Sequence, residues 1–113
     1  MSNEASLRAG HFAVIFTAEL SDDLQGYEAS ASGIRALAAR QPGFLGINAV
    51  TEGPSEITVS YWESAEAIRA WKQHPEHIRA QQLGRRRWYR HYEVRVCRIE
   101  RAYAGPGPET SRS

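Results

Sequence analysis

The order of its periodic segments constrains the fold of this chain more than any other feature. Alternating apolar and other side chains, the period of a strand, occur in four segments: residues 11–20, 44–51, 56–62 and 88–103. Apolar residues at helical spacing fill two more segments, residues 24–40 and 65–83. The resulting order predicts an α+β ferredoxin-like βαββαβ domain, with the helices on one face of an antiparallel sheet.

Capping and turn residues set the expected ends of the first helix and the first hairpin. Residues 21–23, Ser-Asp-Asp, supply side-chain oxygens and negative charge for the start of a helix that we expect to reach about Arg40. A Pro-Gly pair at residues 42–43 ends it. The Gly-Pro pair at residues 53–54 marks a turn, so the strands around it should form an antiparallel hairpin.

The second helical segment contains its own interruption. Ser64 can cap a helix over residues 65–73. Pro75 lacks a backbone donor and clashes with a preceding turn, so the helix must break or restart near His74. We expect the restarted helix to continue to a stop signal at Gly84.

The length of 113 residues allows one domain, which we place at residues 11–103 between a loose segment, 1–10, and a flexible tail, 104–113. The sequence has no apolar run of roughly 20 residues, the length that spans a membrane, and its first ten residues lack the apolar core of a signal peptide. We therefore expect a cytoplasmic protein. Cys97 is the single cysteine, and we interpret it as a small buried or interface side chain without a disulfide or metal.

Charge is unevenly distributed along the chain. The net charge is +1, but residues 1–63 sum to −5 and residues 64–113 to +6. Three consecutive arginines at residues 85–87 precede Trp88, a composition found in nucleic-acid patches. Such domains are usually strongly basic overall, so we do not expect nucleic acid as a partner. A solvated helix end, or a positive rim around a pocket for anionic ligands, fits this cluster better.

Aromatic and imidazole side chains are concentrated in residues 61–92. This stretch holds all three tryptophans and three of the four histidines: Trp62, Trp71, Trp88, His74, His77 and His91. Tryptophan combines a large apolar body with one polar group, and imidazole titrates near neutrality. A wall of these residues suits a flat, electron-rich ligand. The structural alternatives are core packing for Trp62 and Trp71, a capping role for His74, solvent exposure for His77, and interface contacts for Trp88 and His91.

The second face of the predicted sheet requires a cover. Residues 11–20 carry apolar side chains on both sides of the strand, and helices protect only one of them. In a chain this short, a second copy related by a two-fold axis is the simplest cover. We therefore expect a homodimer.

Several motifs resemble the antibiotic biosynthesis monooxygenase (ABM) family of dimeric α+β barrels. They are Gln-Pro-Gly-Phe-Leu-Gly at residues 41–46, Tyr-Trp-Glu-Ser at residues 61–64, Ala-Trp-Lys at residues 70–72, and His77 in the broken helix. The resemblance covers about residues 11–103. It implies a small dimer whose pocket lies between the helices and the sheet of each protomer. Some members oxidise aromatic polyketides with O2 and no metal or flavin, others degrade haem, and many have no assigned activity.

The haem-degrading members use a tryptophan, an iron-binding histidine ten residues later, and an asparagine on the first strand. Trp71 fits this pattern, but Gln81 and Phe16 stand at the other two positions. An amide is a poor iron ligand beside neutral imidazole. We therefore expect no haem turnover by that mechanism, with His77, one turn before Gln81, as the alternative ligand.

Resemblance to the metal-free members implies oxygen chemistry without a cofactor. A deprotonated, electron-rich substrate reduces O2 itself, so the protein supplies a dry pocket, a base and donors for an oxyanion. The catalytic candidates are Trp71, as a wall, and His74 and His77, as bases. The candidates for substrate binding are Trp62, Asn48, Trp88, His91 and Tyr92, with His91 as a further possible base.

We therefore expect a cofactor-independent monooxygenase that oxidises a small aromatic or polyketide-like compound, with no metal and no cofactor. The competing hypothesis is a non-catalytic, ligand-binding or stress-related barrel protein. Histidines that face a closed pocket would favour the enzyme, and histidines that face solvent would favour the binding protein.

Overall fold

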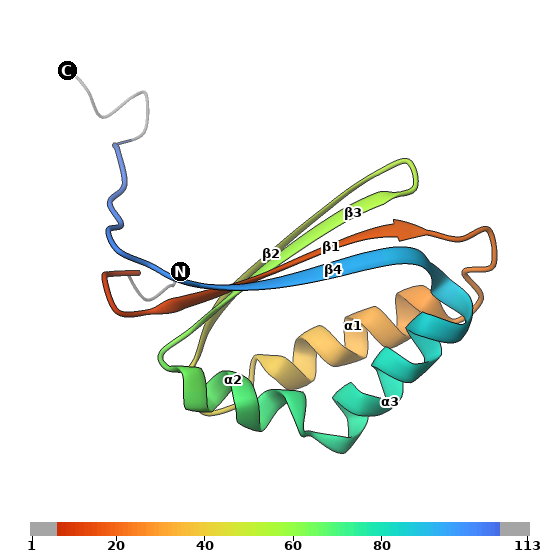
Figure 1. The fold of residues 1–113 in the computed structure, drawn as a ribbon, viewed down its shortest axis with the longest axis horizontal. Coiled ribbons are helices and arrows are strands. Elements are labelled where there is room, and N and C mark those ends of the chain that lie inside the picture. The colour runs from red at the N-terminus through yellow and green to blue at the C-terminus, as the bar shows by residue number, and fades with distance from the viewer. Residues whose placement is uncertain (1–6, 107–113) are drawn as a thin grey trace.

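The computed structural model describes residues 7–106, which form one sheet covered by helices on one face (Figure 1). The antiparallel sheet has the strand order β2-β3-β1-β4. Its strands are β1 (Phe12–Leu20), β2 (Phe44–Glu52), β3 (Ser55–Trp62) and β4 (Tyr89–Arg98). The helices are α1 (Tyr27–Ala38), α2 (Ala65–Lys72), α3 (Pro75–Leu83) and a π-helical segment, η1 (Gly84–Trp88). The predicted ferredoxin-like α+β fold is confirmed.

The register of the sheet separates an inner face, toward the helices, from an outer face. On β1, Phe16 pairs with Thr58 of β3 and Val94 of β4, and all three side chains line the space under the helices. Because successive side chains of a strand point to opposite faces, Ile15 and its β3 partner Val59 lie on the outer face. The predicted hairpin is also present, since β2 and β3 pair directly around their turn.

The second helical segment breaks where the sequence predicts. The Ser64 side chain caps α2 by accepting a hydrogen bond from the Ala67 backbone N–H at 3.1 Å. His74 then caps α3, which starts at Pro75, where a missing N–H costs nothing. The chain changes direction at the break, and α2 and α3 cover neighbouring parts of the sheet (Figure 1).

The predicted cap at residues 21–23 is wrong. The first helix begins at Tyr27, after Gly26 in a left-handed conformation with φ of 80°. Residues 21–23 are held by η1 instead: Ser21 Oγ donates to the Arg87 carbonyl, and the Asp23 carboxylate pairs with the Arg87 guanidinium at 3.2 Å. These long-range contacts hold the loop after β1 against η1.

The α-helix ends at Leu83 with Gly84 as its C-cap, as predicted, but Gly84 does not adopt the left-handed conformation of a helix stop. It keeps right-handed helical geometry, with φ of −59°, and opens η1. A Cβ at this position would overlap Cε2 of Tyr89, so the close approach of that ring favours glycine here. The last strand begins one residue later than predicted, at Tyr89, and ends at Arg98 rather than at residue 103.

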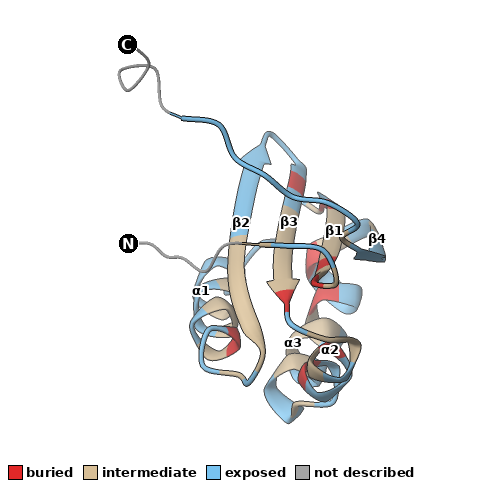
Figure 2. Cartoon of the chain, turned by 90° about the vertical axis from the view of Figure 1, so that its left-hand side faces the viewer, coloured by how far each residue is buried: buried red, intermediate tan, exposed pale blue. Residues whose placement is uncertain are grey.

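Two clusters form the core between the sheet and the helices (Figure 2). The first contains Ala38, Trp62, Ile68 and Trp71, and the second contains Leu20, Tyr27 and Trp88. Trp62 is fully buried, which confirms the core role considered for it. Cys97 is exposed on the outer face, so its expected burial within the chain is wrong. The predicted loose segments, 1–10 and 104–113, lie largely outside the described residues.

Candidate functional site

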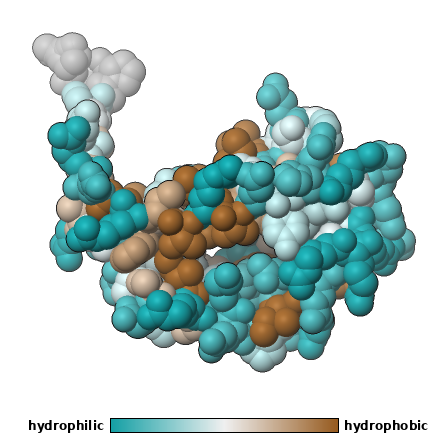
Figure 3. Space-filling view, viewed as in Figure 1, coloured by the Kyte–Doolittle hydropathy of each residue, from teal (hydrophilic) through white to brown (hydrophobic). Residues whose placement is uncertain are grey.

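A cavity of about 190 Å³ lies between the inner face of the sheet and the helices. Its walls are mainly apolar, and Figure 3 shows the hollow between the two layers, bordered on one side by hydrophobic residues. An apolar cavity of about 150 Å³ holds a benzene ring. This cavity therefore has room for one substituted aromatic ring or a compact two-ring system.

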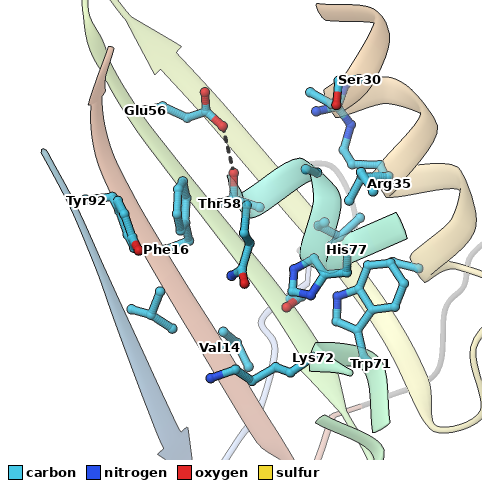
Figure 4. Close-up of a pocket in the computed structure, with 18 of the residues that line it drawn as sticks. Val14, Phe16, Ser30, Arg35, Glu56, Thr58, Trp71, Lys72, His77 and Tyr92 are labelled. Carbon is cyan, nitrogen blue, oxygen red and sulfur yellow. Dashed lines mark hydrogen bonds between the residues drawn. The ribbon is translucent and has the colours of Figure 1, made fainter. Parts of the chain in front are cut away.

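At one end of the cavity, the His77 imidazole stacks on the Trp71 indole (Figure 4). Their ring centroids are 4.6 Å apart and their planes differ by 21°. The Trp71 indole is itself stacked on Trp62, at 6.3 Å between centroids. The helix break at Pro75 produces this arrangement, because it brings the first turn of α3 over the last turn of α2.

The environment of His77 keeps its imidazole neutral at pH 7. Burial lowers the pKa of His77 to about 4, and the nearby Lys72 ammonium acts in the same direction. The Trp71 backbone favours the protonated ring but offsets only part of this effect. Within residues 7–106, no group meets hydrogen-bond geometry with the buried Nδ1 atom of His77. The ring is thus a neutral, incompletely satisfied group in an aromatic wall.

The other predicted bases are not in the cavity wall. The Nδ1 atom of His74 accepts a hydrogen bond from the Glu76 backbone N–H at 3.2 Å, so His74 is a helix cap that touches the edge of the Trp71 ring. His91 is exposed on β4, and its Nε2 lies 3.2 Å from a Glu93 carboxylate oxygen. Of the three candidates, the structure brings only His77 to the cavity.

Some of the residues predicted to bind substrate line the cavity, and others do not. Trp62, Trp88 and Tyr92 line the cavity, whereas Asn48 is exposed on β2 and its neighbour Ile47 lines the cavity instead. The Trp88 indole N–H donates to the Gln25 carbonyl at 3.1 Å, so this donor is already used.

Polar groups suited to binding an oxyanion lie on α3 and β4. Gln81 follows His77 by four residues, on the same face of α3, and also lines the cavity. The Tyr92 hydroxyl accepts a hydrogen bond from the Arg85 guanidinium at 3.2 Å and keeps its own proton to donate. Together they provide an amide and a hydroxyl donor in the wall.

A further polar group, which was not predicted from the sequence, lies on β3. Glu56 is buried in the cavity wall, where Tyr27 donates a hydrogen bond to Oε1 and Thr58 donates to Oε2 at 3.1 Å. Burial, reinforced by the Glu56 carboxylate, raises the pKa of Tyr27 above its ordinary value and that of Tyr89 to about 12. The two-residue period of β3 could have identified Glu56, because it places Glu56 on the same inner face as Trp62, a residue predicted to bind substrate.

The basic cluster is partly neutralised by acids. Arg87 pairs with Asp23, and Arg90 pairs with Asp22, each at 3.2 Å.

Over residues 7–106, no three histidine, cysteine or acidic side chains gather as metal ligands do. No helix in that part of the chain has the length and apolar character needed to cross a membrane.

Comparisons with known proteins agree with this architecture. The chain is 46% identical over 92 residues to the uncharacterized protein YqjZ of Bacillus subtilis (strain 168), a match that covers 80% of this chain and 81% of YqjZ. Its fold is similar to that of SnoaB, a cofactor-independent oxygenase from Streptomyces nogalater, with a TM-score of 0.72, 18% identity, and coverage of 83% of this chain and 97% of SnoaB.

A dimeric protein of unknown function with a ferredoxin-like fold, from Bacteroides fragilis NCTC 9343, is also similar. Its TM-score is 0.61 at 15% identity, and the match covers 82% of this chain and all of that one. The model of the family described as antibiotic biosynthesis monooxygenase matches residues 20–83, more than half of the chain. The chain therefore belongs to the antibiotic biosynthesis monooxygenase family.

Proposed function

We propose that this protein is a cofactor-independent monooxygenase that oxidises a small, electron-rich aromatic compound with O2. The observation that carries the proposal is the neutral His77 imidazole, stacked on Trp71 in the wall of an aromatic cavity. Such a ring can accept a proton from a bound substrate. Membership of the family and the similarity of the fold to SnoaB support the same chemistry.

The proposed reaction begins with proton transfer from the substrate carbon or hydroxyl to His77. The resulting carbanion or phenolate transfers electrons to O2, and recombination forms a carbon-bound peroxide. Cleavage of the O–O bond leaves one oxygen atom in a carbonyl product and releases the other as water. The substrate supplies both electron pairs that reduce O2, so the protein needs only to bind, deprotonate and exclude water.

Charge around His77 suits the anionic stage of this reaction. Lys72 borders the same end of the cavity, and its ammonium attracts the substrate anion. An anion beside the ring also favours imidazolium, which counteracts the low pKa of the empty site. The Gln81 amide and the Tyr92 hydroxyl are the proposed donors to the developing oxyanion.

Oxygen consumption in metal-free buffer with EDTA tests the proposal. We expect the wild-type protein to accelerate O2 uptake by at least one compound in a panel of one-ring and two-ring phenols and an anthrone, with one carbonyl oxygen incorporated from labelled O2. If no compound in the panel is oxidised faster than in buffer alone, the non-catalytic binding protein becomes the better interpretation.

Haem turnover is not expected from this cavity. Gln81 borders the cavity at the position of the expected iron ligand, and an amide is a poor ligand for iron. We predict that a hemin titration gives weak or no binding, and that added ascorbate does not bleach the Soret band. Tight binding followed by loss of the band and release of iron would contradict this prediction.

We also propose that two copies associate through the outer face of the sheet. Val50 and Ile57 are paired across β2 and β3, are 69% and 50% exposed, and face away from the helices. Their inner-face neighbour Glu56 points the other way, so the helices cannot cover them. The dimeric ferredoxin-like relative supports this assembly.

Replacing Ile57 with lysine should convert the dimer to a monomer, because two charges would be buried against each other at the two-fold interface. Light scattering is expected to give about twice 12.7 kDa for the wild type and 12.7 kDa for the variant. Glu66→Lys, on the exposed side of α2, is the control and should remain dimeric. A wild-type protein that is monomeric at micromolar concentration would contradict the prediction.

A further inference from the structure

Glu56 is a buried carboxylate without a cationic partner. Its exposed fraction is 7%, and it accepts hydrogen bonds on both oxygens, from the hydroxyls of Tyr27 and Thr58. Both partners are neutral hydroxyls, so these hydrogen bonds supply no positive charge to the carboxylate. None of the ion pairs within residues 7–106 includes Glu56.

Removing an anion from water without a counter-charge is costly, and two neutral hydroxyls compensate only part of the cost. Arg35 and Lys72 line the same cavity, but neither forms an ion pair with Glu56. Figure 4 shows Arg35 extending from α1, on the helix side, with Glu56 on the sheet. The negative charge therefore faces a cavity that can admit a positive one.

Aromatic rings surround this end of the cavity. Phe16 lies 5.3 Å from Tyr89 and 5.8 Å from Tyr92, and Tyr27 lies 6.3 Å from Tyr89, measured between ring centroids. All four line the cavity together with Glu56. The faces of such rings are electronegative and attract ammonium groups, and several rings around one carboxylate form a site for an organic cation.

The register of the sheet places Glu56 and Tyr92 on its inner face, on either side of one residue of β1. Ala18 of β1 pairs with Glu56 on one side and with Tyr92 on the other. The backbones of Glu56 and Tyr92 are therefore two strand spacings apart, roughly 9–10 Å. Both side chains line the cavity, so one ligand bound in it can contact the carboxylate and the Tyr92 ring together.

We propose that the Glu56 end of the cavity binds the protonated amino group of a small aromatic alkylamine. The ammonium donates hydrogen bonds to the carboxylate oxygens of Glu56, and the aromatic ring of the ligand extends toward Trp71 and His77. A neutral alcohol of the same shape satisfies the lone pairs of the carboxylate but not its charge. As a statement about the substrate of an oxygenase, this inference rests on the function proposed above; as a statement about binding, it stands alone.

Three isosteric probes test the inference: 2-phenylethylamine, 2-phenylethanol and phenylacetate. Their dissociation constants are measured calorimetrically at pH 7 and 150 mM salt, with no turnover required. The wild-type protein is expected to bind the amine at least about tenfold more tightly than the alcohol, as a desolvated cation contact with a carboxylate and aromatic rings allows. Phenylacetate should bind most weakly.

In Glu56→Gln, amine and alcohol should bind with affinities within about threefold of each other, because the charge is gone and the shape is kept. Glu66→Gln removes an exposed carboxylate from α2 and should keep the wild-type preference. If Glu56→Gln fails to fold, Tyr92→Leu on the edge strand serves instead, and should weaken amine binding severalfold while leaving alcohol binding nearly unchanged.

Equal binding of amine and alcohol by the wild type, no binding of any probe, or an amine preference that survives in Glu56→Gln would overturn the inference. Oxygen uptake measured separately distinguishes the two proposals. Amine preference without oxidation of any compound would remove the oxygenase and keep the binding site. Oxidation without amine preference would remove the proposed amine-binding site and keep the proposed oxygenase activity.

Discussion

Replacing His77 with alanine is expected to lower the rate of substrate oxidation by about 10²–10⁴-fold, the usual contribution of a positioned general base. His77 is the histidine that lines the cavity, and its ring stacks on Trp71 at 4.6 Å. His74→Ala should retain most of the activity, because that side chain caps α3 and lies outside the cavity wall. The His74→Ala substitution should instead lower the free energy of unfolding by about 0.5–2 kcal/mol, because the helix cap is lost.

Oxygen uptake with the best wild-type substrate measures the effect, and thermal melts verify that each variant is folded. The pH profile adds a second test. Since burial lowers the pKa of His77 to about 4, kcat/KM should persist down to about pH 5, where an ordinary imidazole base would be protonated. Equal activity in His77→Ala and the wild type would exclude His77 as the base.

Local signals predicted most of the fold correctly. Pro75 must break a helix wherever it falls, and Ser64 caps the helix next to it in sequence, so both features were predictable without tertiary information. The failures occurred where distant contacts decided the outcome. Asp23 pairs with Arg87 instead of capping the first helix, and Gly84 is favoured by the close approach of the Tyr89 ring rather than by a left-handed helix stop.

The site was less predictable than the fold for the same reason. Sequence reasoning found His77 and Trp71 but could not separate His77 from His74, because the direction of α3 after the break decides which ring reaches the cavity. Asn48 was placed on a strand but not on a face. Glu56 was overlooked, although the two-residue period of β3 puts it on the same face as Trp62.

The free energy of unfolding should fall as the pH is lowered, and protonation of His77 should account for part of this loss. The pKa of His77 is about 4 in the folded protein and about 6.5 when unfolded. Between these values the unfolded chain binds more protons than the folded one, so lowering the pH stabilises the unfolded state. The loss begins below about pH 6.5, is complete near pH 4, and amounts to roughly 2–3 kcal/mol of unfolding free energy.

His77→Phe isolates this contribution, because phenylalanine keeps a ring against Trp71 and cannot be protonated. Urea unfolding at pH 7, 5.5 and 4, at one protein concentration, should show a loss of stability in the wild type that exceeds the loss in His77→Phe by that roughly 2–3 kcal/mol. Parallel losses in the wild type and His77→Phe would mean that His77 is protonated in the folded protein as readily as in water, and the neutral base proposed above would then lose its physical basis.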